Sequence, residues 1–362
     1  MICCINCFKD YEVRSIIRSL ENRGDCQFCG STGEFIYDTE TDDSLIALFD
    51  ELLSAYSPRS LLPADYPEEL LGMLKDELCE TWDIFAIDRR HVYQLVSSIC
   101  KEQYAENRHL FDTPVGIPEM AQEEYIAINS LLKTGSWKDF VTSIKTDSRF
   151  HTRHINTDIL SLFCTYATRT HKRGERFYRS RISNKGGLAI SEMGAPPALK
   201  ATAGRANPEG ISYLYLSSNE ETTLKEIRAG AHDYVTIGEF VLEQDINVVD
   251  LTAIDQVSAF SGLDFAQHVI NKRHLRKISS EIARPLRRVD SPLDYLPTQY
   301  ICDFIKSIQH DGKPEYQGIK YGSTMSRNGY NLAVFDQNSF KCVSASVVDI
   351  RELKYEYDRV SL

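Results

Sequence analysis

Four cysteines near the start of the chain place the strongest local constraint on how it can fold. They form two C-x2-C pairs separated by eighteen residues, Cys4 with Cys7 and Cys26 with Cys29. Each pair can place two thiolates on one tight turn, and two such turns complete a tetrahedron around Zn²⁺. Because sulfur would fill all four positions, the spacing predicts a structural zinc site within a small module, residues 1–38.

The same residues leave three alternatives open. The four cysteines can be reduced thiols packed in a small core. A redox-active pair is disfavoured, because no thioredoxin-like βαβ pattern follows either C-x2-C. In the third alternative Cys3 replaces Cys4 as a ligand, and the spacing does not choose between them. Nucleic-acid binding by this module is disfavoured because acidic residues lie close by, at Asp10, Glu12, Glu21 and Asp25.

The composition of the whole chain is that of an acidic globular protein. Its 362 residues include 41 Lys and Arg against 52 Asp and Glu, which gives a formal net charge of −11. Affinity for phosphate backbones depends on Lys and Arg, so nucleic acid is a disfavoured partner. No segment approaches the ~18 apolar residues of a membrane helix, and the N-terminus lacks the layout of a secretory signal. We therefore expect a cytoplasmic protein with no membrane partner.

Residues 39–169 have the apolar periodicity of a helical domain. After Asp88, apolar residues recur at i, i+3, i+4, i+7 and i+8, namely Val92, Leu95, Val96, Ile99 and Cys100. Similar patterns predict helices over 45–52, 70–78, 118–133 and 157–166. We expect these apolar faces to form a core.

One polar pair in the helical part suggests a different chemistry. Arg149 and His154 have the Arg-x4–6-His spacing of ribonuclease domains of the HEPN class, in which both side chains assist attack by a 2′-hydroxyl. Arginine and histidine are common on surfaces, and this spacing often arises by chance. We expect a solvated helix start here and keep an RNA-binding or ribonuclease function as an alternative.

After residue 170 the pattern changes to short strands with helices between them. Strands are predicted over 177–182, 213–217, 234–242, 247–251, 318–321 and 332–335. Many connections are too short for regular βαβ units, so a compact α+β domain is expected. The capping-box sequence that starts at Ser218 predicts a helix with Leu224 and Ile227 facing inward. Another helix is predicted to begin at Pro297.

Three segments of this domain carry groups suited to a dinucleotide. They contain Arg179, then Arg205, Tyr215 and Glu226, and finally Ser323 and Asn331. Guanidinium groups suit a diphosphate because they make bidentate bonds to its oxygens. Tyrosines can stack on a flat ring, and a single carboxylate can stabilise a sugar cation. These groups are typical of a site that cleaves a glycosidic bond in a dinucleotide.

The same segments resemble RES-domain proteins. The run GRANPEGISYLYLSSNEETTLKEIRA is close to the family pattern GRWN-P-G-x-YL-S-x-E-x-A-x-x-E. FYRSR precedes it, and YLPTQYICDFIK and GIKYGSTMSRNGYNLAVF match the family's closing helix, serine turn and asparagine strand. The usual tryptophan is Ala206 here, which puts a packing or stacking role for that residue in doubt. The N-terminal part is similar to the cysteine-containing helical region found before some RES domains and beside HEPN domains.

The resemblance implies an α+β, ADP-ribosyltransferase-like RES domain at 170–350, preceded by the zinc module (1–38) and the helical domain (39–169). Several RES proteins are toxins that destroy NAD⁺. The resemblance implies substrate-binding roles for Arg179, Arg205, Tyr215 and Asn331, and catalytic roles for Glu226, Arg205, Tyr215 and Ser323.

The expected function is that of an NAD⁺ glycohydrolase or phosphorylase, a toxin or defence effector. The alternative is transfer of ADP-ribose to a macromolecule. Hydrolysis and phosphorolysis stay open, because water and phosphate are both small nucleophiles that need no distinctive motif. Unrestrained NAD⁺ consumption would harm its host, so an antitoxin or regulatory protein is expected as a partner. A homodimer is favoured.

Overall fold

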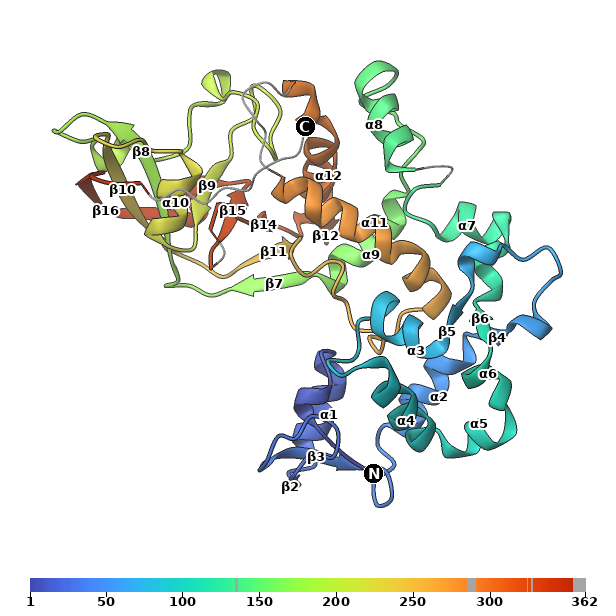
Figure 1. Cartoon of the computed structure of the whole chain (residues 1–362). Helices are drawn as coiled ribbons and strands as arrows, with labels where there is room; N and C mark the ends of the chain where they lie inside the picture. Colours follow the sequence, from blue (N-terminus) through green and yellow to red (C-terminus); the bar gives the residue numbers. More distant parts are fainter. Residues whose placement is uncertain (134–135, 285–290, 324, 327, 354–362) are drawn as a thin grey trace, which may run out of the picture. The chain divides into compact units, whose positions relative to one another are not determined.

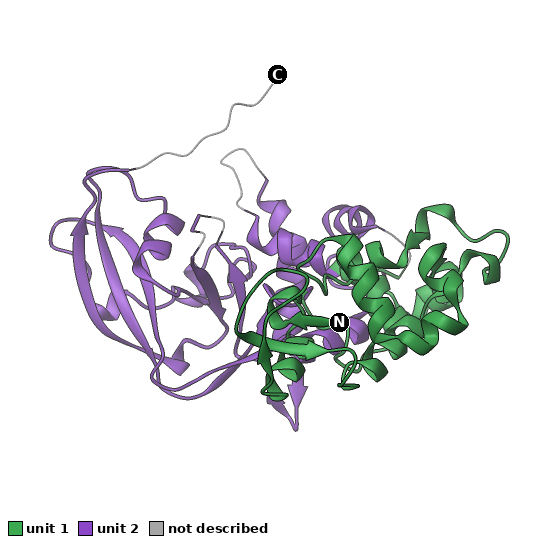
Figure 2. Cartoon of the chain, turned by 60° about the horizontal axis from the view of Figure 1, so that its bottom comes forward, with its two compact units in different colours: residues 1–134, 256–274 green, residues 135–255, 275–362 purple. Residues whose placement is uncertain are grey.

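The chain divides into two compact units. The computed structural model describes residues 1–133, 136–284, 291–323, 325–326 and 328–353, and Figure 1 labels the elements along the chain. Unit 1 consists of residues 1–134 with 256–274, and unit 2 of residues 135–255 with 275–362 (Figure 2). The sequence predicts three domains, 1–38, 39–169 and 170–350. They are defined by residue pattern and not by compactness, so the two units do not test them, and they stay predictions.

The start of unit 1 is a small antiparallel sheet around the cysteine pairs. Its strands lie in the order β1 (Ile2–Cys4), β3 (Glu34–Asp38) and β2 (Arg23–Gly24). A 3₁₀ turn, Ile5–Cys7, follows β1, and helix α1 (Tyr11–Ser19) comes next. Asp10 caps α1 because its side chain accepts hydrogen bonds from the backbone N–H groups of Glu12 and Val13.

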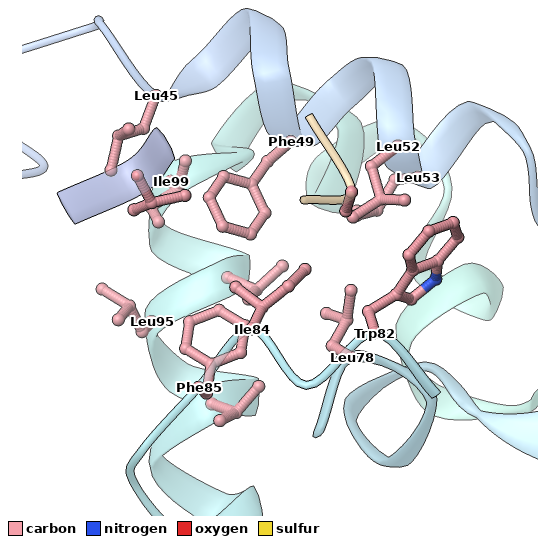
Figure 3. Close-up of a cluster of buried hydrophobic side chains, with 14 of the residues drawn as sticks. Leu45, Phe49, Leu52, Leu53, Leu78, Trp82, Ile84, Phe85, Leu95 and Ile99 are labelled. Carbon is pink, nitrogen blue, oxygen red and sulfur yellow. The ribbon is translucent and has the colours of Figure 1, made fainter. Parts of the chain in front are cut away.

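Short helices make up most of the rest of unit 1. They are α2 (Ile46–Ser54), α3 (Leu74–Asp76), α4 (Arg89–Ile99), α5 (Lys101–Glu106), α6 (Arg108–Asp112) and α7 (Glu123–Asn129). A second small sheet has the order β4 (Ser57–Pro58), β6 (Pro114–Gly116) and β5 (Gly72–Met73). Apolar side chains from α2, α4 and the segment after α3 fill the core, among them Phe49, Trp82 and Leu95 (Figure 3).

Two of the helices predicted in this region are wrong in extent. The predicted helix over 70–78 is interrupted, because Gly72 and Met73 pair with β6 instead of continuing a helix. The predicted helix over 118–133 is split into a 3₁₀ turn, Pro118–Ala121, and α7, because Gln122 between them has an extended backbone. In both places tertiary pairing or local backbone conformation overrides the apolar periodicity.

Residues 256–274 fold with the first part of the chain. Ala266, Val269 and Ile270 belong to the same buried cluster as the helices of unit 1. Asn271 accepts a hydrogen bond from the backbone N–H of Leu131 (2.6 Å) and Ser258 donates one to Asp10 (2.7 Å). This segment contains the first half of helix α11 (Phe265–Ala283).

An eight-stranded sheet forms the centre of unit 2 (Figure 1). Its order is β16 (Phe340–Asp349), β10 (Tyr234–Leu242), β8 (Arg176–Ser183), β9 (Leu214–Ser217), β15 (Tyr330–Val334), β14 (Gly318–Gly322), β11 (Ile246–Asp250) and β7 (Thr168–His171). All neighbours are antiparallel except β11 and β14. The helices are α8 (Trp137–Thr146), α9 (Thr157–Tyr166), α10 (Glu220–Glu226), the second half of α11, and α12 (Leu296–Ser307); β12 (Gln309–His310) and β13 (Lys313–Pro314) form a separate pair.

The α+β fold class and the six predicted strands are confirmed, with bounds that differ by no more than two residues. The sequence reading missed β7 and β16, which are the two edge strands of the sheet. Most side chains of β16 are at least partly exposed, so its sequence FKCVSASVVD lacks the apolar pattern of a buried strand. No helix of the described residues is both long and apolar enough to cross a membrane.

The capping of α10 differs from the prediction. Asn219, not Ser218, is the N-cap, and its side chain accepts from the backbone N–H of Thr222. Ser218 instead accepts a hydrogen bond from the backbone N–H of Tyr330 (3.1 Å). The buried face of the helix carries Thr222 and Thr223 rather than the predicted leucine and isoleucine, which are only partly buried.

Candidate functional site

The carboxylate of Glu226 is held by two hydrogen bonds on one oxygen. Ser323 Oγ donates to Oε1 at 2.7 Å, and Asn331 Nδ2 donates to the same oxygen at 2.8 Å. The fold therefore brings Glu226 together with two residues that lie about 100 positions later in the sequence. Because both donors engage Oε1, Oε2 keeps its lone pairs for a ligand.

Helix α10 sets the position of Glu226. Thr222 and Thr223 face inward, and residues three and four positions further on lie on the same helical face. Thr223 Oγ1 accepts a hydrogen bond from a backbone N–H of β8 at 2.9 Å, which fixes the helix against that strand. A Cβ on Gly329 would overlap Thr222, so the segment before β15 can approach α10 only because residue 329 is glycine.

Asn331 lies in the middle of a row across three strands. It is directly opposite Tyr321 of β14 on one side and Ser217 of β9 on the other. Residues directly opposite each other on antiparallel strands share one face of the sheet. This register places Asn331, Ser217 and Tyr321 on a common face. Of these three residues, the sequence predicts a role only for Asn331.

Arg179 is a partly buried cation in the middle of β8. Burial, and next the charge of Arg181, lowers the pKa of Arg179 to about 10, so the guanidinium stays protonated at neutral pH. Its Nη1 is buried and has no hydrogen-bond partner among the residues that the structure describes. A buried charged group without a partner is costly, and an anion bound there would supply the missing hydrogen bonds.

Arg205 has a structural contact that its sequence context did not reveal. Its Nη1 donates to the backbone carbonyls of Ile282 and Ala283, both at 2.7 Å, at the C-terminal end of α11. These carbonyls have no partner within the helix, and a cation next to them is favourable. The remaining N–H groups of Arg205 extend from an anchored guanidinium. Such anchoring lowers the entropy cost of binding an anion.

Tyr215 holds the loop that carries Arg205. Its hydroxyl donates to Asn207 Oδ1 at 2.6 Å and accepts from the backbone N–H of Ala206 at 3.2 Å. From α12, Gln299 donates to the carbonyl of Gly204 at 2.7 Å. The hydroxyl of Tyr215 thus has a structural use, and contact with a ligand is left to its ring.

Tyr321 is a buried residue of this site that sequence reasoning did not assign. Burial raises its pKa, while the charge of Arg205 lowers it and that of Glu226 raises it. The Arg205 guanidinium lies 5.5 Å from the centre of the Tyr321 ring. The signal in the sequence is that Tyr321 stands two positions before Ser323 in a short strand.

A model of the RES domain matches residues 176–358, just over half of the chain. The protein belongs to the RES-domain family. The match spans every predicted residue of the carboxylate site, from Arg179 to Asn331. No curated protein and no solved structure gives a significant match. The Ala206 that replaces the usual tryptophan is fully buried, which places this position of the RES domain in the protein interior.

The N-terminal cysteines of this RES-domain protein form a four-sulfur cluster. The Sγ atoms of Cys4, Cys7, Cys26 and Cys29 all lie within 4.8 Å of one another, and the closest pairs are 3.4 Å apart. Four thiolates bound to Zn²⁺ at about 2.3 Å would be separated by roughly 3.8 Å, so the cluster fits a tetrahedral metal ion. Cys3 is buried outside this cluster, which favours Cys4 as the ligand.

Hydrogen bonds prepare one turn of the cluster for a thiolate. The backbone N–H groups of Phe28 and Cys29 both point at Cys26 Sγ, at 3.4 Å. Burial opposes ionisation of Cys29, but hydrogen bonds from Ser31 and neighbouring thiols outweigh it and lower the pKa to about 6. Burial raises the pKa of Cys4 to about 11. A metal ion bound here would therefore displace protons as it binds.

Arg149 and His154 do not stand at a helix start as expected. Both lie between α8, which ends at Thr146, and α9, which begins at Thr157. Arg149 is exposed, whereas the Nδ1 of His154 is buried without a hydrogen-bond partner in the described part of the chain. The helix prediction failed because Asn156, closer to the apolar run, caps α9.

Proposed function

We propose that this RES-domain protein cleaves NAD⁺ at the nicotinamide–ribose bond and acts as a toxin or defence effector that depletes NAD⁺. The observation that carries the proposal is the Glu226 carboxylate, which Ser323 and Asn331 orient in the same unit as Arg179, a partly buried arginine whose Nη1 has no hydrogen-bond partner among the described residues. A fixed negative charge of this kind stabilises a sugar cation, and the arginine suits a diphosphate.

The bond cleavage needs no acid catalyst. The C–N bond breaks and its electron pair stays on the pyridine nitrogen, so nicotinamide leaves as a neutral molecule. Positive charge develops on the ribose, and the carboxylate of Glu226 stabilises it. Water or inorganic phosphate then forms the new bond at the anomeric carbon, and an attacking water releases its proton to solvent. One carboxylate suffices, whereas ordinary glycosidases use two.

The two arginines have different parts in substrate binding. Arg179 supplies a protonated guanidinium whose Nη1 has no partner among the described residues, which suits a diphosphate oxygen. Arg205 contributes N–H groups other than those that cap α11. The ring of Tyr215 packs against the nicotinamide end.

Zn²⁺ has a structural role in this proposal. Cys4, Cys7, Cys26 and Cys29 would hold it and leave no position open for a substrate. The metal ion would cross-link the start of unit 1, and no step of NAD⁺ cleavage depends on it.

The reaction is tested by incubating the purified protein with NAD⁺, with and without phosphate, and identifying the products by mass. We expect free nicotinamide together with ADP-ribose or its phosphate. Glu226→Gln should abolish the release, whereas Glu221→Gln, five residues earlier in α10 and paired with Lys225 on the surface, should not. Equal rates for Glu226→Gln and the wild type would contradict the proposal. Label retained on protein or nucleic acid would instead indicate ADP-ribosyl transfer.

The partners follow from the proposed activity. An enzyme that consumes NAD⁺ needs restraint, so we propose an antitoxin or a regulatory protein, and a homodimer as the assembly. Light scattering on the purified protein measures the assembly directly. RNA cleavage that survives Arg205→Ala but not His154→Ala would favour the ribonuclease alternative.

A further inference from the structure

We infer that Ser217 is a positioning residue for Glu226 and that it acts through the side-chain amide of Asn331. The inference rests on the proposed function, because it concerns the carboxylate that stabilises the sugar cation. It adds Ser217 to the site. This residue lies on the strand next to that of Asn331, and its side chain donates a hydrogen bond to Asn331 rather than to Glu226.

Three side chains form a continuous hydrogen-bonded relay. Ser217 Oγ donates to Asn331 Oδ1 at 2.7 Å, and Asn331 Nδ2 donates to Glu226 Oε1 at 2.8 Å. Ser217 and Asn331 are 4 % and 3 % exposed, so bulk water does not compete for these bonds. The two residues are directly opposite each other on β9 and β15, which fixes their distance through the sheet register.

The relay determines which end of the amide faces the carboxylate. An asparagine side chain has an acceptor end and a donor end, and a half-turn about its last bond exchanges them. The exchange would place Oδ1 against the negative Glu226 oxygen and Nδ2 against the Ser217 hydroxyl. The contact between Oδ1 and Glu226 is unfavourable, because two acceptors then face each other in a buried position, whereas the Ser217 hydroxyl can accept from Nδ2 as well as donate to Oδ1. The Glu226 carboxylate therefore sets which end of the amide faces it, and the Ser217 hydroxyl, by donating to Oδ1, anchors the amide so that Nδ2 stays within reach of Oε1.

The orientation of the Asn331 amide affects the carboxylate of Glu226 together with Ser323. Ser323 donates to the same Oε1, so the two donors together fix the plane of the carboxylate and leave Oε2 for the ribose. If the amide turns, one donor is lost and the carboxylate can rotate about its remaining bond. The expected consequence is a lower turnover number with little change in substrate affinity, because the diphosphate contacts are made elsewhere.

The test compares Ser217→Ala with a matched control on the neighbouring strand. Ser180 of β8 is equally buried, at 4 %, and its Oγ has no hydrogen-bond partner among the described residues. Ser217→Ala should lower kcat for NAD⁺ cleavage about tenfold with KM changed less than twofold. Ser180→Ala should leave both constants unchanged. Ser217→Thr, which keeps the hydroxyl, should restore most of the activity.

A double-mutant cycle isolates the relay. In an Asn331→Ala background the substitution Ser217→Ala should have no further effect on kcat, because the relay is already broken. An equal loss in both backgrounds, or a Ser217→Ala enzyme within twofold of the wild type, overturns the inference. Ser217→Cys keeps the side-chain volume and gives an intermediate kcat if the hydrogen bond, rather than packing, is responsible.

A measurement independent of turnover separates this inference from the proposed function. Hydrogen exchange of the Asn331 side-chain amide, followed by NMR, should be slow in the wild type and in Ser180→Ala and faster in Ser217→Ala. If the exchange rate of the Asn331 amide is unchanged in Ser217→Ala, the relay is overturned, whatever the rate of NAD⁺ cleavage. A wild type that exchanges slowly but does not consume NAD⁺ overturns the proposed function and leaves the relay standing.

Discussion

The cysteine cluster of unit 1 and the Glu226 site of unit 2 are assembled in opposite ways. The four cysteines lie within 26 consecutive residues, from Cys4 to Cys29, and two tight turns suffice to bring their sulfurs together. The Glu226 site draws on α10, β14 and β15, and its residues meet only when the eight-stranded sheet has formed. Short spacing can therefore specify a candidate metal site, whereas the candidate site at Glu226 depends on sheet register.

The two regions also differ in what their side chains stabilise. A tetrahedral metal centre contributes to the free energy of folding, because the unfolded chain has no preformed site. In the proposed reaction, an oriented carboxylate such as that of Glu226 would contribute mainly to stabilising the transition state. Substitutions should therefore separate the regions: those in the cluster should lower stability, and those at Glu226 should lower activity.

The largest expected effect is loss of the metal centre. Cys4→Ala should remove bound zinc, and because structural zinc contributes on the order of 10 kcal/mol in small modules, the start of unit 1 should unfold. Metal content measured by elemental analysis and unfolding followed by circular dichroism check this. Cys3→Ala is the control and should keep its zinc. The assignment of Cys4 as ligand is refuted if Cys3→Ala loses the metal and Cys4→Ala retains it.

The next effect is on turnover. Glu226→Gln should lower the rate of nicotinamide release by about 10²–10³-fold, the usual cost of removing one oriented group that stabilises developing charge. Its thermal unfolding temperature should stay within a few degrees of the wild type, since the amide keeps the volume and can still accept from Ser323 and Asn331. If Glu226→Gln is unfolded at 25 °C, Glu226 is needed for stability, and the expected difference between the two regions is contradicted.

A smaller effect is expected on substrate affinity. Arg179→Ala should raise KM for NAD⁺ about tenfold or more, because a charge-assisted hydrogen bond contributes roughly 1.5–3 kcal/mol. Stability should not fall, since the substitution removes a partly buried cation whose Nη1 has no partner in the described structure. Arg181→Ala is the control, because its Nη1 donates to the carbonyl of Glu192. Equal KM values for the two variants would exclude Arg179 from the binding site.

The smallest effect concerns the pH dependence of unit 1. Burial, and next the charge of Lys272, lowers the pKa of His268 from 6.5 to about 3. The folded state therefore favours neutral His268, and its contribution to stability is full above pH 6.5 and is lost as the pH falls from 6.5 toward 3. At pH 4.5 the loss should be on the order of 2 kcal/mol.

Tryptophan fluorescence can assign this pH effect to unit 1. His268 packs edge-on against Trp82, with ring centres 5.3 Å apart, and the other tryptophan of the chain, Trp137, belongs to unit 2. In a Trp137→Phe protein, urea midpoints followed by Trp82 should fall between pH 7 and pH 4.5. His268→Gln should flatten that dependence. An unchanged slope in His268→Gln would show that other groups cause the acid sensitivity.

The sequence predicts correctly those strands of unit 2 whose buried side chains give an apolar pattern. The six strands of unit 2 that it predicted are present, because their alternating side chains are set by burial. It missed the edge strands β7 and β16, whose polar residues carry no such pattern. It also gave α10 the wrong cap, because Ser218 has a partner in Tyr330, more than 100 positions away.

At the candidate site, the sequence identified residue types but not their pairings. Glu226, Ser323 and Asn331 were expected to belong to one site, and the fold places Ser323 and Asn331 within hydrogen-bond distance of Glu226. Ser217 was not expected, because its importance depends on lying opposite Asn331 in the sheet. Arg205 was expected to bind an anion and to take part in catalysis, yet one of its nitrogens caps α11, which no local motif indicates.

The sequence by itself determined the cysteine cluster, the order of the main strands and the chemical groups of the site. Covalent spacing fixes which atoms can meet across a tight turn, and apolar periodicity fixes which face of a strand or helix is buried. Only the tertiary structure decided that residues 256–274 fold with the first part of the chain, and that both Ser323 and Asn331 engage a single oxygen of Glu226. Such pairings join segments far apart in the chain, and they form only when packing and strand register have brought those segments together.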